Sequence, residues 1–338
     1  MEKFSQFRDR GSGVSPFLPI KTPSTLFSAT IRIFIFLVRL GVFLPYAACY
    51  FLFLQHLPLP VAVRKLLLWG LMGIAGVWWL DLQLDNVKRG SLWQQPPSRV
   101  PHPRSVIAAN FTSPVDALYL AGVFDPIFTL SYPGTRKVRR VGLLRAMWAA
   151  LSPAQLTTPP SPAGLTDLRA LLAQNPTRTV AVFPECATTN GQGILPLSPS
   201  LLTVPPDVSI FPLSMRYTPA DVTTPVPGYY RRFLWKLLSR PAHGVRVRIA
   251  EALFNTSQER TNGYQWPEDG QDGQQQQQRY TGAADGVTAG HDTTAEEQRV
   301  LDQVAEALAR LGRAKRVGLT VHDKKAFVEA WKKSRSRK

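Results

Sequence analysis

Cysteine is scarce in this chain of 338 residues, because only Cys49 and Cys186 occur and they form no Cys-x-x-Cys pair. This scarcity excludes a disulfide-stapled scaffold and a cysteine-based structural zinc site, and it makes a reducing, cytosolic environment the default. Acidic residues are also few: 23 Asp and Glu stand against 40 Lys and Arg, which gives a formal net charge of +17. The positive excess predicts an anionic partner, either nucleic acid, lipid or a phosphorylated metabolite.

Apolar residues are sufficient for a folded core. Hydrophobic residues make up 44% of the chain, which excludes a wholly disordered protein because enough apolar surface is present to offset the entropy lost on folding. The 29 prolines and 23 glycines exclude a long coiled coil. The length fits one domain of catalytic size with appendages.

Two apolar runs near the N-terminus predict a membrane hairpin over residues 31–90. As a helix, the run 33–54 would rise about 33 Å, close to the roughly 30 Å hydrocarbon core of a bilayer. The second run, 66–80, would rise only about 22 Å and contains the pair Trp78-Trp79, which is typical of a headgroup boundary. We expect the hairpin to span or dip into the bilayer with both ends in the cytosol, since basic residues flank it on both sides. The alternative is a helical subdomain buried against the soluble fold.

The remaining sequence divides into four parts. Short β-rich segments alternate with helical ones over 98–254, which predicts an α/β domain with a mixed sheet flanked by helices. Residues 255–294 are poor in apolar residues and rich in glutamine, which predicts a disordered insert. A basic segment, 1–30, precedes the hairpin, and helices with a basic tail form 295–338. Within the domain we expect strands at 105–110, 179–183, 208–217 and 245–250, and helices at 116–123 and 165–174.

Two short segments follow buried strands and enter turns, the positions where α/β folds place active sites. They read Asn110-Phe-Thr-Ser-Pro-Val-Asp116 and Phe183-Pro-Glu-Cys-Ala-Thr-Thr-Asn-Gly191. In this order, they resemble the two main motifs of glycerolipid acyltransferases of the lysophosphatidic acid acyltransferase type, Asn-His-x-Ser-x-x-Asp and Phe-Pro-Glu-Gly-Thr. The resemblance covers roughly 64–251 and is strongest to the fungal lysophosphatidic acid:oleoyl-CoA acyltransferases. It implies a glycerol-3-phosphate acyltransferase-like fold.

The resemblance implies that Asp116 and Glu185 are catalytic. In the family, a histidine accepts the proton of the glycerol hydroxyl as it attacks the acyl-CoA thioester, and the aspartate orients that histidine. Here Phe111 replaces the histidine, and phenylalanine cannot accept a proton. Three explanations stay open: Asp116 acts as the base itself, a histidine such as His243 enters the site, or the chain is a degenerate acyltransferase. His102 should lie at the opposite end of the strand.

Substrate binding is implied for the rest of the two motifs and for a basic stretch after the first. The usual phosphate-binding arginine motif between them is absent, so the phosphate is expected on the basic stretch. Cys186 occupies a family glycine position and is interpreted as a small hydrophobic residue. Residues 210–213 resemble the motif that lines the acyl pocket. The expected binding residues are Asn110, Phe111, Ser113, Pro114, Phe183, Pro184, Thr188, Thr189, Asn190 and Gly191 in the motifs, with Arg136, Lys137, Arg139, Arg140 or Arg145 as phosphate ligands.

The leading hypothesis is therefore a membrane-bound acyltransferase that moves a fatty acyl group from acyl-CoA to a lysophospholipid. Acyl-CoA is the co-substrate, membrane lipids are the other partners, and no metal or bound cofactor is implied. The expected location is the endoplasmic reticulum membrane or the lipid droplet surface, with the active domain in the cytosol. The alternative is a non-catalytic lipid-binding or tethering protein. A nucleic-acid partner is not expected, since no RNA-recognition motif, zinc pattern or basic recognition helix occurs.

Overall fold

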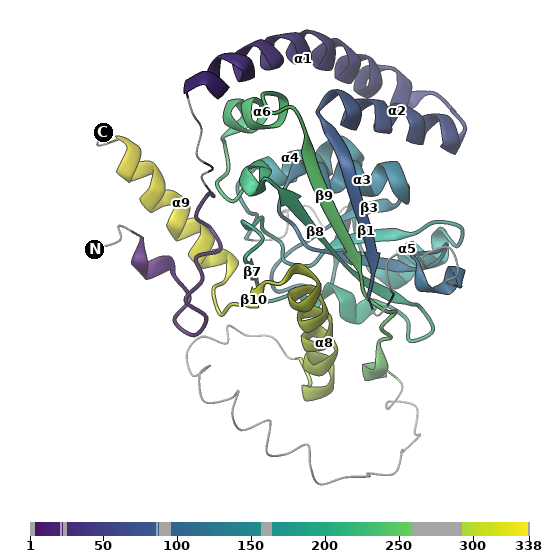
Figure 1. Ribbon diagram of the computed structural model, residues 1–338. Helices are drawn as coiled ribbons and strands as arrows, with labels where there is room; N and C mark the ends of the chain where they lie inside the picture. The colour runs from purple at the N-terminus through teal and green to yellow at the C-terminus, as the bar shows by residue number, and fades with distance from the viewer. Residues whose placement is uncertain are drawn as a thin grey trace.

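A mixed sheet of eight strands forms the centre of the computed structural model, which describes residues 4–20, 22, 26–85, 87, 96–156, 164–258 and 293–336 (Figure 1). The strand order is β1-β9-β8-β2-β6-β3-β4-β5. The strands are β1 (Val77–Leu84), β2 (Val106–Ala109), β3 (Ile127–Ser131), β4 (Val138–Val141), β5 (Leu165–Thr166), β6 (Val180–Phe183), β8 (Ile210–Thr218) and β9 (His243–Ile249). A second, two-stranded sheet pairs β7 (Gly193–Ile194) with β10 (Lys315–Arg316). The expected α/β class with a mixed sheet is confirmed.

Helices cover both faces of the sheet. Strands β8, β2, β6 and β3 run parallel, while β9 and β4 are antiparallel to their neighbours β8 and β3. Along β2, Ile107 and Ala109 join the larger core with α2, α3 and α4, whereas Val106 and Ala108 join a second core with α5 and α8. The helices are α1 (Leu26–Leu52), α2 (Val61–Ile74), α3 (Pro114–Val123), α4 (Leu143–Leu151), α5 (Leu168–Gln174), α6 (Tyr230–Leu238), α8 (Ala295–Gly312) and α9 (Val321–Ser336).

The second apolar run does not form one membrane helix, which corrects the prediction for residues 66–80. Helix α2 ends at Ile74, and the chain continues as β1, an edge strand that pairs in parallel with β9. The physical reason is a period of two, in which Leu80 and Leu82 alternate with the polar Asp81 in a strand with one buried face. The α/β domain therefore includes residues before 98.

The two helices of the N-terminal region nevertheless form a hairpin. Tyr46 of α1 donates a hydrogen bond to the carbonyl of Leu67 in α2, at 2.9 Å. Helix α2 also packs on the domain, where its Leu68 and Met72 are buried. Trp69 reaches across to donate to the carbonyl of Gly122 in α3, at 3.1 Å. The second arm of the hairpin is thus part of the domain's core.

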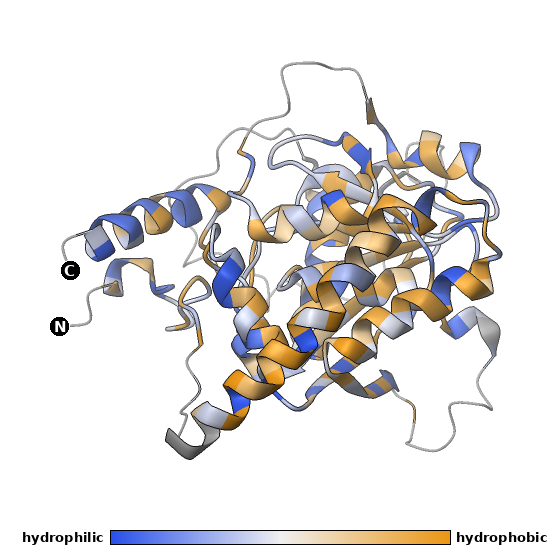
Figure 2. Cartoon of the chain, turned by 90° about the horizontal axis from the view of Figure 1, so that it is seen from above, coloured by the Kyte–Doolittle hydropathy of each residue, from blue (hydrophilic) through white to orange (hydrophobic). Residues whose placement is uncertain are grey.

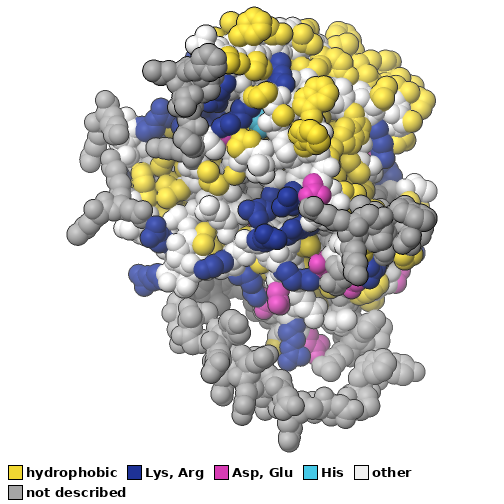
Figure 3. Space-filling model, viewed as in Figure 1, with side chains coloured by type: hydrophobic (Ala, Val, Ile, Leu, Met, Phe, Trp, Pro, Cys, Tyr) yellow, Lys and Arg dark blue, Asp and Glu magenta, His cyan; other side chains and the backbone are white. Residues whose placement is uncertain are grey.

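Helix α1 crosses one end of the molecule (Figure 1). Seen from above, the helices there are mostly hydrophobic, and the space-filling view shows hydrophobic side chains gathered over the same end (Figures 2 and 3). Phe34, Leu66 and Trp79 are among the exposed side chains. Within the described part of the chain, one helix, Ala29–His56, is long and apolar enough to cross a membrane by length and composition.

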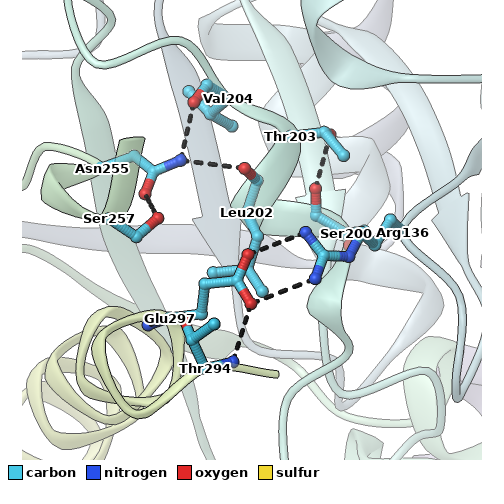
Figure 4. A network of polar contacts seen from close by, with 9 residues as sticks. All are labelled: Arg136, Ser200, Leu202, Thr203, Val204, Asn255, Ser257, Thr294 and Glu297. Atoms are coloured by element: carbon cyan, nitrogen blue, oxygen red, sulfur yellow. Dashed lines mark hydrogen bonds and ion pairs between the residues drawn. The ribbon is translucent and has the colours of Figure 1, made fainter. Parts of the chain in front are cut away.

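The structured domain extends into the predicted insert. Most of 255–294 lies outside the described residues, but Asn255 is completely buried and its Nδ2 donates to the carbonyls of Leu202 and Val204 (Figure 4). At the other boundary, Thr294 is the N-cap of α8. The prediction of disorder is therefore wrong at residue 255, because a buried amide that bonds two loop carbonyls is part of the fold.

Candidate functional site

The carboxyl ends of β2, β6 and β3 meet at one edge of the sheet, and a cavity of about 220 Å³ lies there. Parallel strands bring their carboxyl ends to the same edge, which is where α/β folds bind ligands. The cavity wall includes Phe111 from the first motif, Phe183 and Cys186 from the second, Ser131 at the end of β3, and Arg145 and Trp148 of α4.

The two motifs are in direct contact. The ring of Phe111 stacks on that of Phe183 with centroids 4.6 Å apart. The amide of Phe111 donates to Oε1 of Glu185 at 3.1 Å, and the amide of Thr189 donates to the carbonyl of Phe111 at 3.0 Å. Two segments that are distant in the sequence therefore lie side by side in the fold.

Asp116 is completely buried at the start of α3 and its carboxylate accepts several hydrogen bonds. Ser113 is the N-cap and Pro114 follows it, with Asp116 closing a capping box. Oδ2 of Asp116 accepts from the amides of Thr112 and Ser113 at 2.7 and 2.8 Å, while Oδ1 accepts from the hydroxyl of Tyr217. Burial raises the pKa of Asp116 to about 6, although these hydrogen bonds oppose the shift.

Tyr217 was missed by the sequence reasoning. It lies near the end of β8, a predicted strand, and burial raises the pKa of its hydroxyl well above the usual value. The signal available in the sequence was a tyrosine in an apolar strand, whose buried hydroxyl requires a partner. Asn110 also joins the first motif to β8, since its side chain donates one hydrogen bond to the backbone of Met215 and accepts another from it.

No histidine in the described ranges is hydrogen-bonded to Asp116. His243 begins β9, where it is buried with Nε2 2.8 Å from the carbonyl of Leu237, and burial lowers its pKa. His102 precedes β2 and contacts the ring of Phe211 edge-on, with centroids 5.7 Å apart. It lies at the end of β2 opposite to Phe111, as expected.

Glu185, a residue of the second motif, is completely buried where this motif contacts the first. In addition to the Phe111 amide, it accepts a hydrogen bond from the amide of Leu195 at 3.2 Å. Burial raises its pKa to about 8; Asp116 raises it further, and the nearby ammonium of Lys324 lowers it. Lys324 is on α9, far along the chain, and is the second residue that the sequence reasoning missed. A lone lysine in an amphipathic helix gives no signal that it is buried.

Cys186 has a backbone conformation that is typical of glycine. Its φ is +56°, in the left-handed region that favours glycine. The thiol lines the cavity, and burial raises its pKa to about 12, which makes it a weak nucleophile. This agrees with its interpretation as a small hydrophobic residue.

The Thr-Thr-Asn-Gly run after Cys186 bonds to distant parts of the chain. Thr188 donates to the carbonyl of Thr224 at 2.7 Å. Nδ2 of Asn190 donates to the carbonyls of Ser15 and Leu18 in the N-terminal segment, at 2.8 and 2.9 Å. Gly191 has a φ of +79°. These four residues are not part of the cavity wall; they connect the site to the rest of the fold.

Of the five cations considered for the phosphate, Arg145 lines the cavity. Arg139 and Arg140 are on β4 and Lys137 precedes it, outside the cavity wall. Arg136 pairs with Glu297 of α8 through two contacts of 2.8 and 3.0 Å (Figure 4). The segment 210–213 likewise lies outside the wall, since Ile210, Phe211 and Leu213 are buried core residues.

Comparison with known proteins gives one informative result. No family model matches the chain, and no solved structure matches it. The chain is similar to a protein of Schizosaccharomyces pombe named "Putative lysophosphatidic acid:oleoyl-CoA acyltransferase", with 27% identity over 268 residues that cover 75% of this chain and 86% of that protein. The resemblance indicated by the two motifs is confirmed.

Proposed function

Because the chain is related to acyltransferases of lipid metabolism, we propose that it transfers a fatty acyl group from acyl-CoA to lysophosphatidic acid at the cavity beside Phe111. The observation that carries the proposal is the direct contact of the two motifs there, with the cation of Arg145 in the same wall. In the reaction, the glycerol hydroxyl oxygen attacks the thioester carbonyl carbon. A C–O ester bond forms, the C–S bond breaks, and CoA leaves as a thiolate. The thiolate then takes up the proton that the glycerol hydroxyl has lost.

The size of the cavity fits the reacting groups rather than whole substrates. Its volume of about 220 Å³ is below the roughly 300–1,000 Å³ of sites that enclose a ligand. Leu144 and Trp148 of α4 are exposed beside it, and the ring of Trp148 stacks on Tyr230 of α6 at 4.9 Å. We place the thioester and the glycerol in the cavity and the acyl chain along this exposed apolar surface.

Arg145 is the proposed ligand of the acceptor phosphate. It is exposed, it lines the cavity, and no carboxylate in the described part of the chain pairs with it. A guanidinium presents several donors to phosphate oxygens in a planar fork, so a free arginine at the cavity suits lysophosphatidic acid.

We assign Asp116 as the general base that accepts the proton of the attacking hydroxyl. A general base works best with a pKa near the operating pH, and burial brings the pKa of Asp116 to about 6. Asp116 is not part of the cavity wall, whereas Phe111 is, so the Phe111 side chain has to move for the carboxylate to be reached. The position of His243, bonded to Leu237, does not support a borrowed histidine.

A specific observation favours a second candidate, a non-catalytic lipid-binding protein. Phe111 closes the wall where the family has its histidine, and both oxygens of Asp116 are already occupied by Thr112, Ser113 and Tyr217. Such a chain would bind lysophosphatidic acid or acyl-CoA without turnover.

One assay separates the two functions. The protein is supplied with labelled oleoyl-CoA and a panel of lysophospholipids, and labelled phosphatidic acid is measured. Under the enzyme proposal, Asp116→Asn should lower transfer by about 10² to 10⁴, the contribution of a positioned general base. Arg145→Gln should raise KM for lysophosphatidic acid, while the matched control Arg140→Gln, at an exposed position of β4, should not. Wild type without turnover but with Arg145-dependent lipid binding would establish the second candidate instead.

The membrane location is part of the proposal. The apolar end formed by α1, α2 and Trp79 supports attachment to the endoplasmic reticulum membrane or a lipid droplet, with the α/β domain in the cytosol. Extraction of membranes with alkaline carbonate should leave the protein in the pellet. Release of the full-length chain into the supernatant would refute the attachment.

A further inference from the structure

Lys324 is a lysine in an unusual place. It lies on α9 and is only 1% exposed. Its Nζ donates to the backbone carbonyl of Thr188 at 2.6 Å and to the Thr188 hydroxyl at 2.7 Å. Its neighbour Lys325 is exposed. The C-terminal helix therefore inserts one ammonium group directly beside the second motif.

The charge is not needed to hold the helix in place. Val321, Phe327 and Val328 of α9 are buried in an apolar cluster with Phe17 and Leu195, and this contact already anchors the helix. A buried ammonium carries a desolvation penalty, and an apolar side chain of similar size is often no less stabilising. Burial accordingly lowers the pKa of Lys324 to about 7, while Glu185 opposes the shift. An ammonium that adds little to stability calls for another explanation.

The contacts of Thr188 lead from Lys324 to the cavity. Thr188 follows Glu185 and Cys186 in the turn after β6, and its hydroxyl is fixed between Lys324 and the carbonyl of Thr224. Glu185, in the same turn, accepts a hydrogen bond from the amide of Phe111. A displacement of Thr188 would therefore move Cys186 and Phe111, which line the cavity.

We propose that Lys324 is a positioning residue of the acyltransferase site, which holds the turn 185–188 in the shape that the cavity requires. The proposal rests on the proposed function, since it concerns the same site. It makes the C-terminal helix a component of a site whose recognisable motifs lie elsewhere in the chain.

The first test compares Lys324→Met with the matched control Lys325→Met. Lys324→Met should lower kcat for acyl transfer by about 10- to 100-fold, the effect of displacing reacting groups by about 1 Å. It should change the melting temperature little, because removal of the buried charge offsets the loss of the donor to the Thr188 carbonyl. Lys325→Met should change neither quantity. A lower melting temperature with unchanged kcat would show that Lys324 is only structural and would overturn the proposal.

The second test does not depend on activity. Cys186 lies in the positioned turn, and in detergent-solubilised protein the exposed Cys49 on α1, which is not part of the cavity wall, provides an internal reference. Labelling by a small maleimide, followed by mass spectrometry, should be at least about five-fold faster at Cys186 in Lys324→Met, with the Cys49 rate unchanged. Equal Cys186 rates in Lys324→Met and wild type would refute the positioning role even if the wild type has no transferase activity.

Thr188→Val removes the hydroxyl that accepts a hydrogen bond from Lys324. This variant replaces Lys324→Met in the labelling test if Lys324→Met does not fold. It should also accelerate labelling of Cys186. In the double variant the two effects should be less than additive, since both variants remove the hydrogen bond between Nζ of Lys324 and the Thr188 hydroxyl. Additive effects, or no acceleration with Thr188→Val, would contradict the proposal.

Discussion

Glu185→Gln is expected to change how the stability of the protein depends on pH. In the unfolded chain the carboxyl is in water, where its ordinary pKa is 4.5, whereas burial in the folded chain raises the pKa to about 8. The folded state thus binds more protons than the unfolded state between these values, and stability falls as pH rises. The contribution is fully present below pH 4.5 and is lost as pH rises through about 8. Glutamine does not titrate, so the variant lacks this loss.

The magnitude follows from the two pKa values. One pKa unit corresponds to about 1.4 kcal/mol, so the interval from 4.5 to about 8 corresponds to at most about 5 kcal/mol of folding free energy. Glutamine itself costs some stability at every pH, because its amide group faces one of the two backbone donors, the amides of Phe111 and Leu195. This offset is independent of pH, and the change of the difference with pH isolates the ionisation.

The assay is thermal unfolding of detergent-solubilised protein at a series of pH values between about 4.5 and 8.5. The melting temperature of the variant relative to wild type should rise across this range by an amount on the order of 10 °C. Glu329→Gln, on an exposed position of α9, is the control and should shift the melting temperature equally at every pH. If the melting temperatures of wild type and Glu185→Gln changed with pH in parallel, the inference that burial raises the pKa of Glu185 would be refuted.

Three further predictions test other parts of the structure. Phe111→His should raise acyl transfer in the oleoyl-CoA assay, up to about 10²-fold, by restoring a base at the cavity wall, and an unchanged rate would mean that the site cannot use it. Cys186→Gly should be more stable in thermal unfolding than Cys186→Ala by about 1 kcal/mol, the reverse of the usual order, because φ is +56° there. Gly122→Val should lower the melting temperature, at a cost of about 1–3 kcal/mol, since even a Cβ would approach Met72 to 3.1 Å. A Cβ at Gly73 meets no atom within 4 Å, so Gly73→Val should cost less.

The predictable part of the fold was the part with strong local patterns. Continuous apolar runs ending in turn residues identified β2, β6 and β8, and the regular apolar spacing after residue 295 identified α8. Strand β1 was missed although its alternation of leucine with Asp81 and Gln83 is visible in the sequence. The Trp78-Trp79 pair within this strand matched a membrane boundary equally well, and the pairing of the strand with β9 decided between a strand and a membrane helix.

The site was only half predictable for a different reason. Phe111, Asp116 and Glu185 lie in short motifs whose order is readable. Tyr217 and Lys324 reach the same motifs from β8 and α9 through contacts between residues far apart in the chain. No local pattern encodes such a partner, because the partner is selected by how the sheet and the terminal helix pack.

The meeting of both chain ends at the second motif has a consequence for biosynthesis. The N-terminal segment bonds to Asn190 and the C-terminal helix bonds to Thr188, so the second contact forms later than the first, only after α9 has left the ribosome. The apolar helix α1, by contrast, emerges before the α/β domain. A nascent chain thus presents its apolar helix long before α9 completes the contacts of the second motif.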